Sequence, residues 1–401
     1  MFFEKFAPFI RRIPYKSNVI LGLLLQSVIL VPLMAQNQSP QPSTQQNPNA
    51  QAPPPEAGGP GGDVGPYVVP KKKEEPPPPP PEKPKKIEGM PDYSIAVDVP
   101  LVNVDVSVLT KDGQFIPGLR KDNFRVLEDG VPQQISNFSQ SEAPITAVLL
   151  VEFASTNYYF LYDALNASYN FASSLKKEDW VAVEYYDMKP HILVDFTQDK
   201  GAIMGALNTL RIPGFSETNL FDALYDTLDR LDRVEGRKYI ILISTGVDTF
   251  SKLNLDQILK KVKTTHNVTI YPVSIGRALR EWFEARGGAA PHGMAPIANI
   301  DYLQADNEMN TFARLTGGRA YFPRFEGELP GIFHDIAADI RNQYVLAYHP
   351  TNAKLDGTYR KLKVELVALG GGPFKVKDQK GKDVKVQIVA REGYTAKHTV
   401  E

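Results

Sequence analysis

The sequence predicts an α/β protein in which a doubly wound, mostly parallel sheet is accompanied by small antiparallel β modules. From residue 145 onward, apolar β runs alternate with segments of helical spacing, which is typical of a parallel sheet with helices on both faces. Between residues 93 and 142, apolar residues instead recur at every second position, as in half-buried antiparallel strands. This β pattern returns beyond residue 343.

Composition narrows the class of function. The chain has 401 residues, of which 45 are basic and 46 are acidic, giving a formal net charge of −1. This length accommodates two or three domains. Because the balanced charge creates no long-range field that favours polyanions, we expect neither nucleic acid nor an anionic membrane surface as a partner. The absence of cysteine excludes disulfides, thiolate metal sites and cysteine nucleophiles.

Residues 1–35 have the pattern of an export signal. Basic residues precede an apolar run at 19–35, which ends in Leu33-Met34-Ala35 before Gln36. The pattern predicts a signal peptide, and the alternative is an uncleaved membrane anchor. Either outcome sends the remaining chain across a membrane, so we expect an exported protein in the periplasm or outside the cell. If the segment is not cleaved, we expect it to anchor the protein in the inner membrane and to be the only part that contacts the membrane.

Residues 36–91 have the composition of a disordered linker. Gln, Asn, Ser and Pro dominate the first half, and an unbroken run of prolines at 76–81 is flanked by Lys and Glu. Such a segment has too little apolar surface to form a core, and its prolines favour extended polyproline II. It is either a spacer that holds the folded part away from a surface or a solvated tail.

Residues 92–142 predict a β-sandwich-like module. Apolar side chains alternate at 95–99 and again at 102–108, and Pro100 shifts the phase between the two sets. Asp-Gly pairs at 112–113 and 129–130 predict hairpin turns, and the second turn is followed by an expected strand over 131–138. The module contains no cluster of catalytic residue types, so we interpret it as structural or docking.

Residues 143–348 predict the doubly wound unit. The expected strands are 145–151, 180–186, an edge strand at 191–196, 239–244 and 269–276. Apolar residues at helical spacing predict helices over 158–175, 201–210, 220–231, 255–265, 302–317 and 329–340. Gly317-Gly318 is typical of a helix C-cap. Residues 285–298 are rich in Gly, Ala and Pro and predict a mobile insertion. Trp282 and Phe283 stand at its start.

The last part of the chain, 349–401, predicts further strands. The apolar runs at 361–366 and 385–389 are separated by glycine-rich turns, and 344–348 is also β-like. We expect this C-terminal segment to pack with the 92–142 module.

Three segments that follow predicted strands are rich in oxygen-bearing side chains. They are 152–157, 215–219 and 245–249. Because parallel strands end at one edge of a sheet and ligand sites lie there, we expect these segments to meet. The residues expected to bind a partner are Glu152, Phe153, Ser155, Thr156, Asn157, Phe215, Ser216, Thr218, Thr245 and Asp248.

Several stretches of the chain together resemble von Willebrand factor type A domains. They are 146–156, 218–224, 239–248 and 270–276, with flanking motifs at 122–130 and 391–394. The chain as a whole is similar to bacterial exported proteins described as VWFA-related. The resemblance implies a doubly wound fold and a role in binding proteins rather than in catalysis.

The resemblance also implies a metal-ion-dependent adhesion site, but key residues differ. Glu152 stands at the first aspartate of the family pattern, Ala154 at a serine and Thr245 at the last aspartate, whereas Thr156 and Thr218 keep their hydroxyls. Mg²⁺ requires near-octahedral oxygen ligation that includes carboxylates. We therefore expect either an empty or weak site, or a remodelled Mg²⁺ site. The latter would use Glu152, Thr156, Thr218 and Asp248.

These observations predict a non-enzymatic protein that binds a protein or peptide through the three segments, with weak or absent metal dependence and no other cofactor. A structural cell-envelope protein is the alternative, and a Mg²⁺-dependent adhesin is a further one. An enzyme would have to use Ser155, which lacks the flanking glycines of a nucleophile elbow. The sequence predicts no oligomeric state.

Overall fold

The computed structural model describes residues 101–140, 143–285, 299–369, 372, 374–377 and 382–396. Contacts separate Met1–Gly89 from Met90–Glu401, and the fold below belongs to the second unit. The expectations for residues 1–91, the alternation at 95–99 and the insertion at 286–298 lie outside the described residues. Within the described part, no helix combines the length and the apolar character that crossing a membrane requires.

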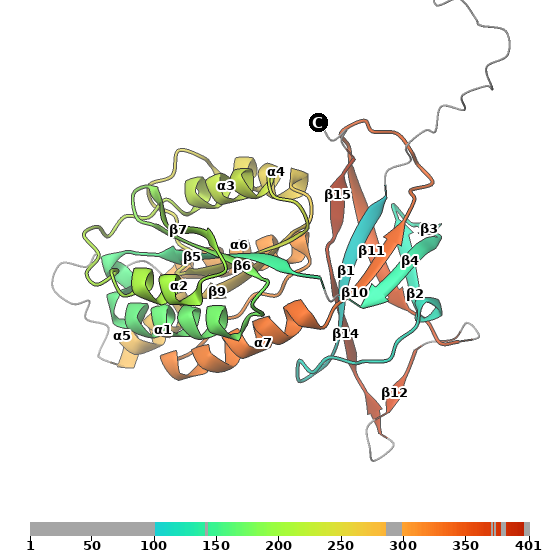
Figure 1. Cartoon of the computed structure of the whole chain (residues 1–401), viewed down its shortest axis with the longest axis horizontal. Coiled ribbons are helices and arrows are strands. Elements are labelled where there is room, and N and C mark those ends of the chain that lie inside the picture. The colour runs from blue at the N-terminus through green and yellow to red at the C-terminus, as the bar shows by residue number, and fades with distance from the viewer. Residues whose placement is uncertain are drawn as a thin grey trace, which may run out of the picture. The chain divides into compact units, whose positions relative to one another are not determined.

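A five-stranded sheet forms the centre of the α/β unit (Figure 1). Its order is β7 (Pro190–Thr197), β6 (Trp180–Tyr186), β5 (Ile145–Glu152), β8 (Arg237–Ser244) and β9 (Val268–Ser274). All pairs are parallel except β6 with β7, which is antiparallel, and β7 lies at the edge of the sheet as expected. Every residue of the central strand β5 is buried, which explains its almost unbroken apolar run.

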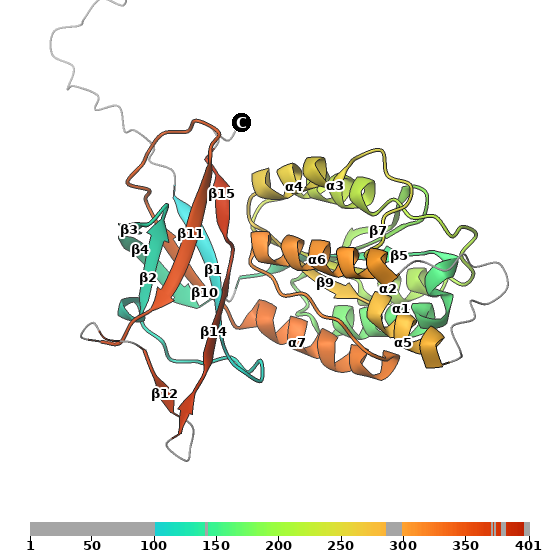
Figure 2. The ribbon, with the colours of Figure 1, turned by 180° about the vertical axis from the view of Figure 1, so that it is seen from behind.

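Helices cover both faces of this sheet, as Figures 1 and 2 show. On one face, α1 (Tyr158–Ser174), α2 (Lys200–Leu207) and α7 (Leu329–Arg341) form one hydrophobic core with the strands. On the other, α3 (Leu220–Leu231), α4 (Leu255–Thr264) and α6 (Asn299–Thr316) form a second core. The predicted doubly wound, mostly parallel sheet is therefore confirmed. Short 3₁₀ turns occupy Lys121–Asn123 (η1), Ser155–Asn157 (η2) and Glu326–Glu328 (η3).

One helix was not predicted. α5 (Gly276–Ala285) follows β9 directly and carries Trp282 and Phe283, which the sequence pattern assigned to the start of an insertion. Both rings pack against a small cluster formed by Phe160 and α5, and the Trp282 ring lies 4.4 Å from that of Tyr159. The two aromatic side chains therefore hold α5 against the first turn of α1.

Two four-stranded antiparallel sheets form the β module. One has the order β14 (Val386–Ala390), β1 (Val102–Thr110), β10 (Tyr344–Tyr348) and β4 (Ile135–Gln140). The other has the order β15 (Gly393–Thr395), β11 (Tyr359–Leu366), β2 (Phe124–Glu128) and β3 (Val131–Gln133). A ribbon of β12 (Val376–Lys377) and β13 (Asp383–Val384) is separate. The C-terminal strands β14 and β11 thus pair with β1 and β2, and the two four-stranded sheets share one apolar core.

Two boundaries differ from the sequence interpretation. The strand expected over 131–138 divides into β3 and β4, which belong to different sheets, because β3 pairs with β2 whereas β4 pairs with β10. The doubly wound unit ends before β10 rather than at residue 348. Tyr344, Leu346 and Tyr348 alternate into the core of the β module, and that alternation places β10 there.

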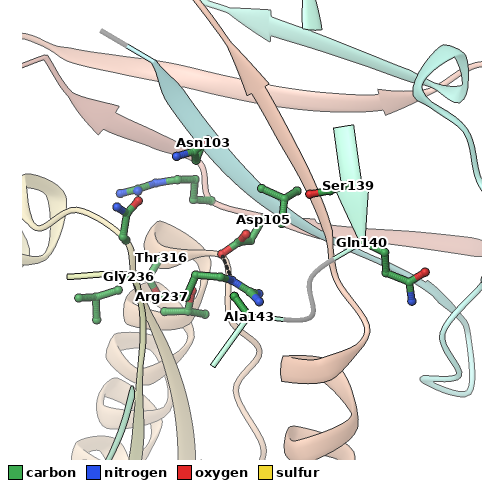
Figure 3. A pocket seen from close by; sticks show the side chains of 13 residues that line it. Asn103, Asp105, Ser139, Gln140, Ala143, Gly236, Arg237 and Thr316 are labelled. Atoms are coloured by element: carbon green, nitrogen blue, oxygen red, sulfur yellow. Dashed lines mark hydrogen bonds and ion pairs between the residues drawn. The ribbon is translucent and has the colours of Figure 1, made fainter. Parts of the chain in front are cut away.

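The base of the parallel sheet joins the β module through polar contacts (Figure 3). At the start of β8, the Arg237 guanidinium pairs with Asp105 of β1 at 3.3 Å, and both residues line a cavity of about 430 Å³. Arg391 also lines this cavity, and it donates to the carbonyls of Gly393 at 2.8 Å and Thr265 at 3.4 Å. Because Thr265 caps the carboxyl end of α4, the helix dipole favours this buried cation. These contacts lie at the opposite end of β8 from the site below.

Candidate functional site

The three predicted segments meet at the carboxyl edge of the parallel sheet. The Ser155 amide donates to the carbonyl of Phe215 at 2.7 Å and so joins the first segment to the second. The Thr218 hydroxyl donates to the Val247 carbonyl at 2.6 Å and joins the second to the third. Strands β5 and β8 end side by side in parallel register, which explains why residues so distant in sequence share one edge.

Glu152 lies at the centre of this edge and is completely buried. Its Oε2 accepts hydrogen bonds from the Ser244 hydroxyl at 2.7 Å, the Thr245 amide at 2.8 Å and the Thr245 hydroxyl at 2.8 Å. The Thr245 hydroxyl is also 3.1 Å from Oε1. The Tyr186 hydroxyl donates to Ser244 Oγ at 2.7 Å and lies 3.5 Å from Glu152 Oε2. We call Glu152, Tyr186, Ser244 and Thr245 the Glu152 network.

The Glu152 network ties the ends of three adjacent strands, β5, β6 and β8. Burial raises the pKa of the Glu152 carboxyl, and the hydrogen bonds from Ser244, Thr245 and Tyr186 oppose that rise. Burial also raises the pKa of the Tyr186 hydroxyl, as does the neighbouring charge of Glu152. Since each of these partners is uncharged, the carboxyl group is held by hydrogen bonds rather than by an ion pair.

The arrangement does not fit a divalent cation at Glu152. The hydroxyl and amide hydrogens of Ser244 and Thr245 point at the carboxylate, where an ion would need lone pairs. Ala154, which is also buried, supplies no oxygen. Within the described ranges, no three His, Asp or Glu side chains are grouped so that they could hold a metal ion.

Two of the other predicted ligands, Thr218 and Asp248, are engaged elsewhere in the protein. The Thr218 hydroxyl is directed to Val247. Asp248 Oδ1 accepts from the Ser251 hydroxyl at 2.6 Å and from the Phe221 amide at 3.3 Å, so its carboxylate caps the first turn of α3. Burial raises the pKa of Asp248, and these hydrogen bonds oppose the rise. Thr156 is half-buried in η2. The four side chains therefore do not fit a common metal site.

Part of the predicted partner-binding set is wrong, because four of its side chains are buried. Glu152, Asn157, Thr218 and Thr245 are all buried, so their side chains cannot contact a partner at this surface. Asn157 Nδ2 donates to the Glu152 carbonyl at 3.0 Å, which fixes the start of α1. Phe153 packs edge-on against Tyr185, with ring centroids 5.4 Å apart, as part of the core. These side chains therefore support the loops of this edge from the interior of the protein.

The remaining predicted residues lie at the surface, with aromatic rings beside them. Phe215 is 48% exposed, and Tyr158 and Tyr159 in the first turn of α1 are each 47% exposed. Ser216 is exposed, and Ser155 and Thr156 are partly so. Exposed aromatic side chains over a rigid base are typical of protein-binding surfaces. We call Phe215, Tyr158 and Tyr159 the aromatic edge.

Sequence reasoning missed Tyr186 and Ser244 as members of the site. Tyr186 is the last residue of β6 and stands directly opposite Glu152 in the strand register. Ser244 is the last residue of β8. Both are polar ends of apolar strands, and that signal, applied to every strand of the sheet, would have identified them.

Comparisons with solved structures find similar folds at low sequence identity. The von Willebrand factor domain of the type V pili tip protein Mfa5 from Porphyromonas gingivalis is 12% identical, with a TM-score of 0.38, over 50% of this chain and 96% of that chain. BatB from Bacteroides thetaiotaomicron is 12% identical, with a TM-score of 0.36, over 49% and 100%. A von Willebrand factor type A protein from Catenulispora acidiphila is 10% identical, with a TM-score of 0.39, over 74% and 75%.

No protein-family model matches the chain, and no curated protein matches it. The strand order and the helices on both faces therefore carry the fold assignment. They establish the doubly wound α/β arrangement that the resemblance to von Willebrand factor type A domains implied.

Proposed function

We propose that this chain is an exported, non-enzymatic protein that binds a protein or peptide partner at the aromatic edge, without a metal ion in the contact. The observation that supports the proposal is the position of three half-exposed aromatic side chains at this edge. Phe215 lies in a loop that is hydrogen-bonded to Ser155, and Tyr158 and Tyr159 lie in the first turn of α1. A preorganised surface loses little conformational entropy when it binds, so its apolar contacts are available for affinity.

The Glu152 network supports the metal-independent part of the proposal. In a metal-bridged contact, the ion would connect the domain to a carboxylate of the partner. Here the Thr245 amide and hydroxyl bind the Glu152 carboxylate directly, and the loops keep their geometry through protein hydrogen bonds. The partner is therefore expected to contribute apolar and hydrogen-bonding groups rather than a metal-ligating carboxylate.

Truncating the Phe215 side chain is expected to weaken partner binding about tenfold or more and to leave stability almost unchanged. The ring is 48% exposed, and only the backbone carbonyl of this residue bonds Ser155. Full-length Phe215→Ala protein and wild type would be immobilised, exposed to an envelope extract, and compared for the amount of each captured protein by quantitative mass spectrometry.

Phe325→Ala is the matched control, because that ring is 55% exposed in another loop, just before η3. A captured protein retained by this control and lost with Phe215→Ala supports the proposal. Capture that is equal for all three proteins contradicts it. Charge reversal at Asp248 is a poor test, since that carboxylate caps α3 and the variant would also damage the fold.

A further inference from the structure

A second surface, separate from the carboxyl edge of the sheet, is a groove of about 1000 Å³ between the outer face of the β module and the helices α4 and α6. Its lining is strongly basic although the chain as a whole has a net charge of −1. Five cationic side chains face two acidic ones. They are Arg125, Lys263, Arg314, Lys361 and Lys363 against Glu365 and Glu392.

Alternation of side chains along a β-strand places two of these cations on the same face of β11. Lys361 and Lys363 are exposed on β11, while the alternating Leu362 and Val364 are buried in the core of the module. On the neighbouring strand β2, Arg125 stands opposite Glu365 in register. The outward positions of these strands face solvent, where a row of cations carries no cost of burial.

The opposite wall is formed by the last turns of two helices. Lys263 is in the last turn of α4, and its Nζ lies 5.6 Å from the centre of the Tyr359 ring. Arg314 is in the last turn of α6 and pairs with Glu392 at 2.7 Å. The carbonyl ends of both helices favour cations at these positions, but the dipole does not account for the lysines of β11.

The acidic side chains in the groove neutralise the cations only in part. Glu365 accepts from Lys363 at 2.8 Å and lies 3.7 Å from Arg125. The side chains of Lys363 and Arg314 are 72% and 60% exposed, and ion pairs of such exposure contribute little stability, so a ligand can replace them. Among the described residues, no ion pair is formed by Lys263 or Lys361.

The groove also has apolar lining between its charges. Leu127 of β2, Leu259 of α4 and Leu315 of α6 contribute to it. Sugars and nucleotide backbones offer little aliphatic surface to such a lining. An extended peptide rich in Glu and Asp offers both carboxylates and side-chain methylene groups, and it therefore complements the groove better.

We propose that this groove binds an extended acidic segment of a partner protein. The carboxylates would pair with Lys361, Lys363 and Arg125 on one wall and with Lys263 and Arg314 on the other. This contact does not depend on the aromatic edge, and each surface can be tested without the other.

The test is binding of a fluorescein-labelled oligoglutamate peptide to the full-length chain, measured by fluorescence anisotropy. We expect saturable binding that weakens as salt is raised, because exposed charges are screened. The double variant Lys361→Glu, Lys363→Glu is expected to weaken binding about tenfold or more, since it reverses two charges in the groove. The double variant Lys176→Glu, Lys177→Glu makes the same charge change at exposed positions after α1 and should bind like wild type. Thermal unfolding checks that both variants are folded.

Several results would overturn the proposal. Equal loss of binding in both double variants would show attraction to net charge rather than to the groove. Absence of saturable oligoglutamate binding at low salt would exclude an acidic peptide as the ligand. Tighter, groove-dependent binding of dextran sulfate or of a single-stranded oligonucleotide would assign the surface to another class of polymer. Salt-sensitive dimers in sedimentation that disappear in the groove variant would assign it to a second copy of the chain.

Discussion

Replacement of Glu152 by alanine is expected to lower the free energy of unfolding by about 3 kcal/mol or more. The substitution removes the acceptor for the Ser244 hydroxyl and for the amide and hydroxyl of Thr245, all of which are buried. It also leaves a cavity at a completely buried position. The loss of free energy would be measured by urea denaturation of the full-length chain.

Thr156→Ala is the control for this variant, because Thr156 was predicted as a ligand of the same site and is only half-buried. We expect its effect on the free energy of unfolding to stay within about 0.5 kcal/mol, as for a surface substitution. If Glu152→Ala were as stable as Thr156→Ala, the carboxylate would not be holding the strand ends together. If both variants lost several kcal/mol, Thr156 would also stabilise the fold, and the comparison would no longer single out the carboxylate.

Arg360→Met should produce the second large loss of stability, about 3–5 kcal/mol, because it leaves a buried carboxylate without its cation. Arg360 is 2% exposed, and its Nη1 donates to Glu128 Oε1 at 3.1 Å. Glu128 also accepts from the hydroxyls of Tyr348 at 2.6 Å and Tyr394 at 2.9 Å. The same guanidinium binds the backbone carbonyls of Asn352 and Lys354. This cluster joins β2, β10, β11 and β15 and so holds both sheets of the β module together.

The double variant Arg360→Met, Glu128→Gln separates the charge from the packing. Because it removes the unpaired charge, we expect it to recover part of the stability lost in Arg360→Met, as judged by urea denaturation in a double-mutant cycle. A double variant that is less stable than Arg360→Met alone would show that the tyrosine hydroxyls, rather than the cation, hold Glu128 in place.

Most of the α/β unit could be predicted from the periodicity of apolar residues. Strands β5, β6 and β8 are apolar runs bounded by polar residues, and the amphipathic helices α3 and α4 carry clear stripes. The turn after β2 was also predictable, because an Asp-Gly pair favours a tight hairpin turn. In the structure, Asp129 and Gly130 both adopt positive φ, of 48° and 86°.

Two features depended on tertiary pairing, and a third was missed although its local pattern is amphipathic. A strand carries no local mark of the sheet it joins, so the division between β3 and β4 and the place of β10 in the β module were missed. Helix α5 starts directly after β9 and was obscured by the Gly- and Ala-rich stretch that follows it. For the strands, a distant partner rather than the segment itself selects the structure.

For the candidate site, the sequence predicted the meeting of the loops but not the direction of their side chains. The rule that parallel strands end at one edge was enough to bring together the segments around Glu152, Phe215 and Thr218. Whether an oxygen at such an edge faces outward or inward depends on its neighbours. Here the replacement of an aspartate by Thr245 supplies an internal donor, and Glu152 turns inward to accept from it.

We infer that the Glu152 network holds this edge together and that the edge does not use a cation. The most direct measurement is a calorimetric titration of the full-length chain with MnCl₂, repeated with MgCl₂, in buffer from which divalent ions have been removed. We expect no saturable heat of binding at metal concentrations up to the millimolar range. A saturable one-to-one heat that Glu152→Ala abolishes, in a variant shown to be folded, would contradict it.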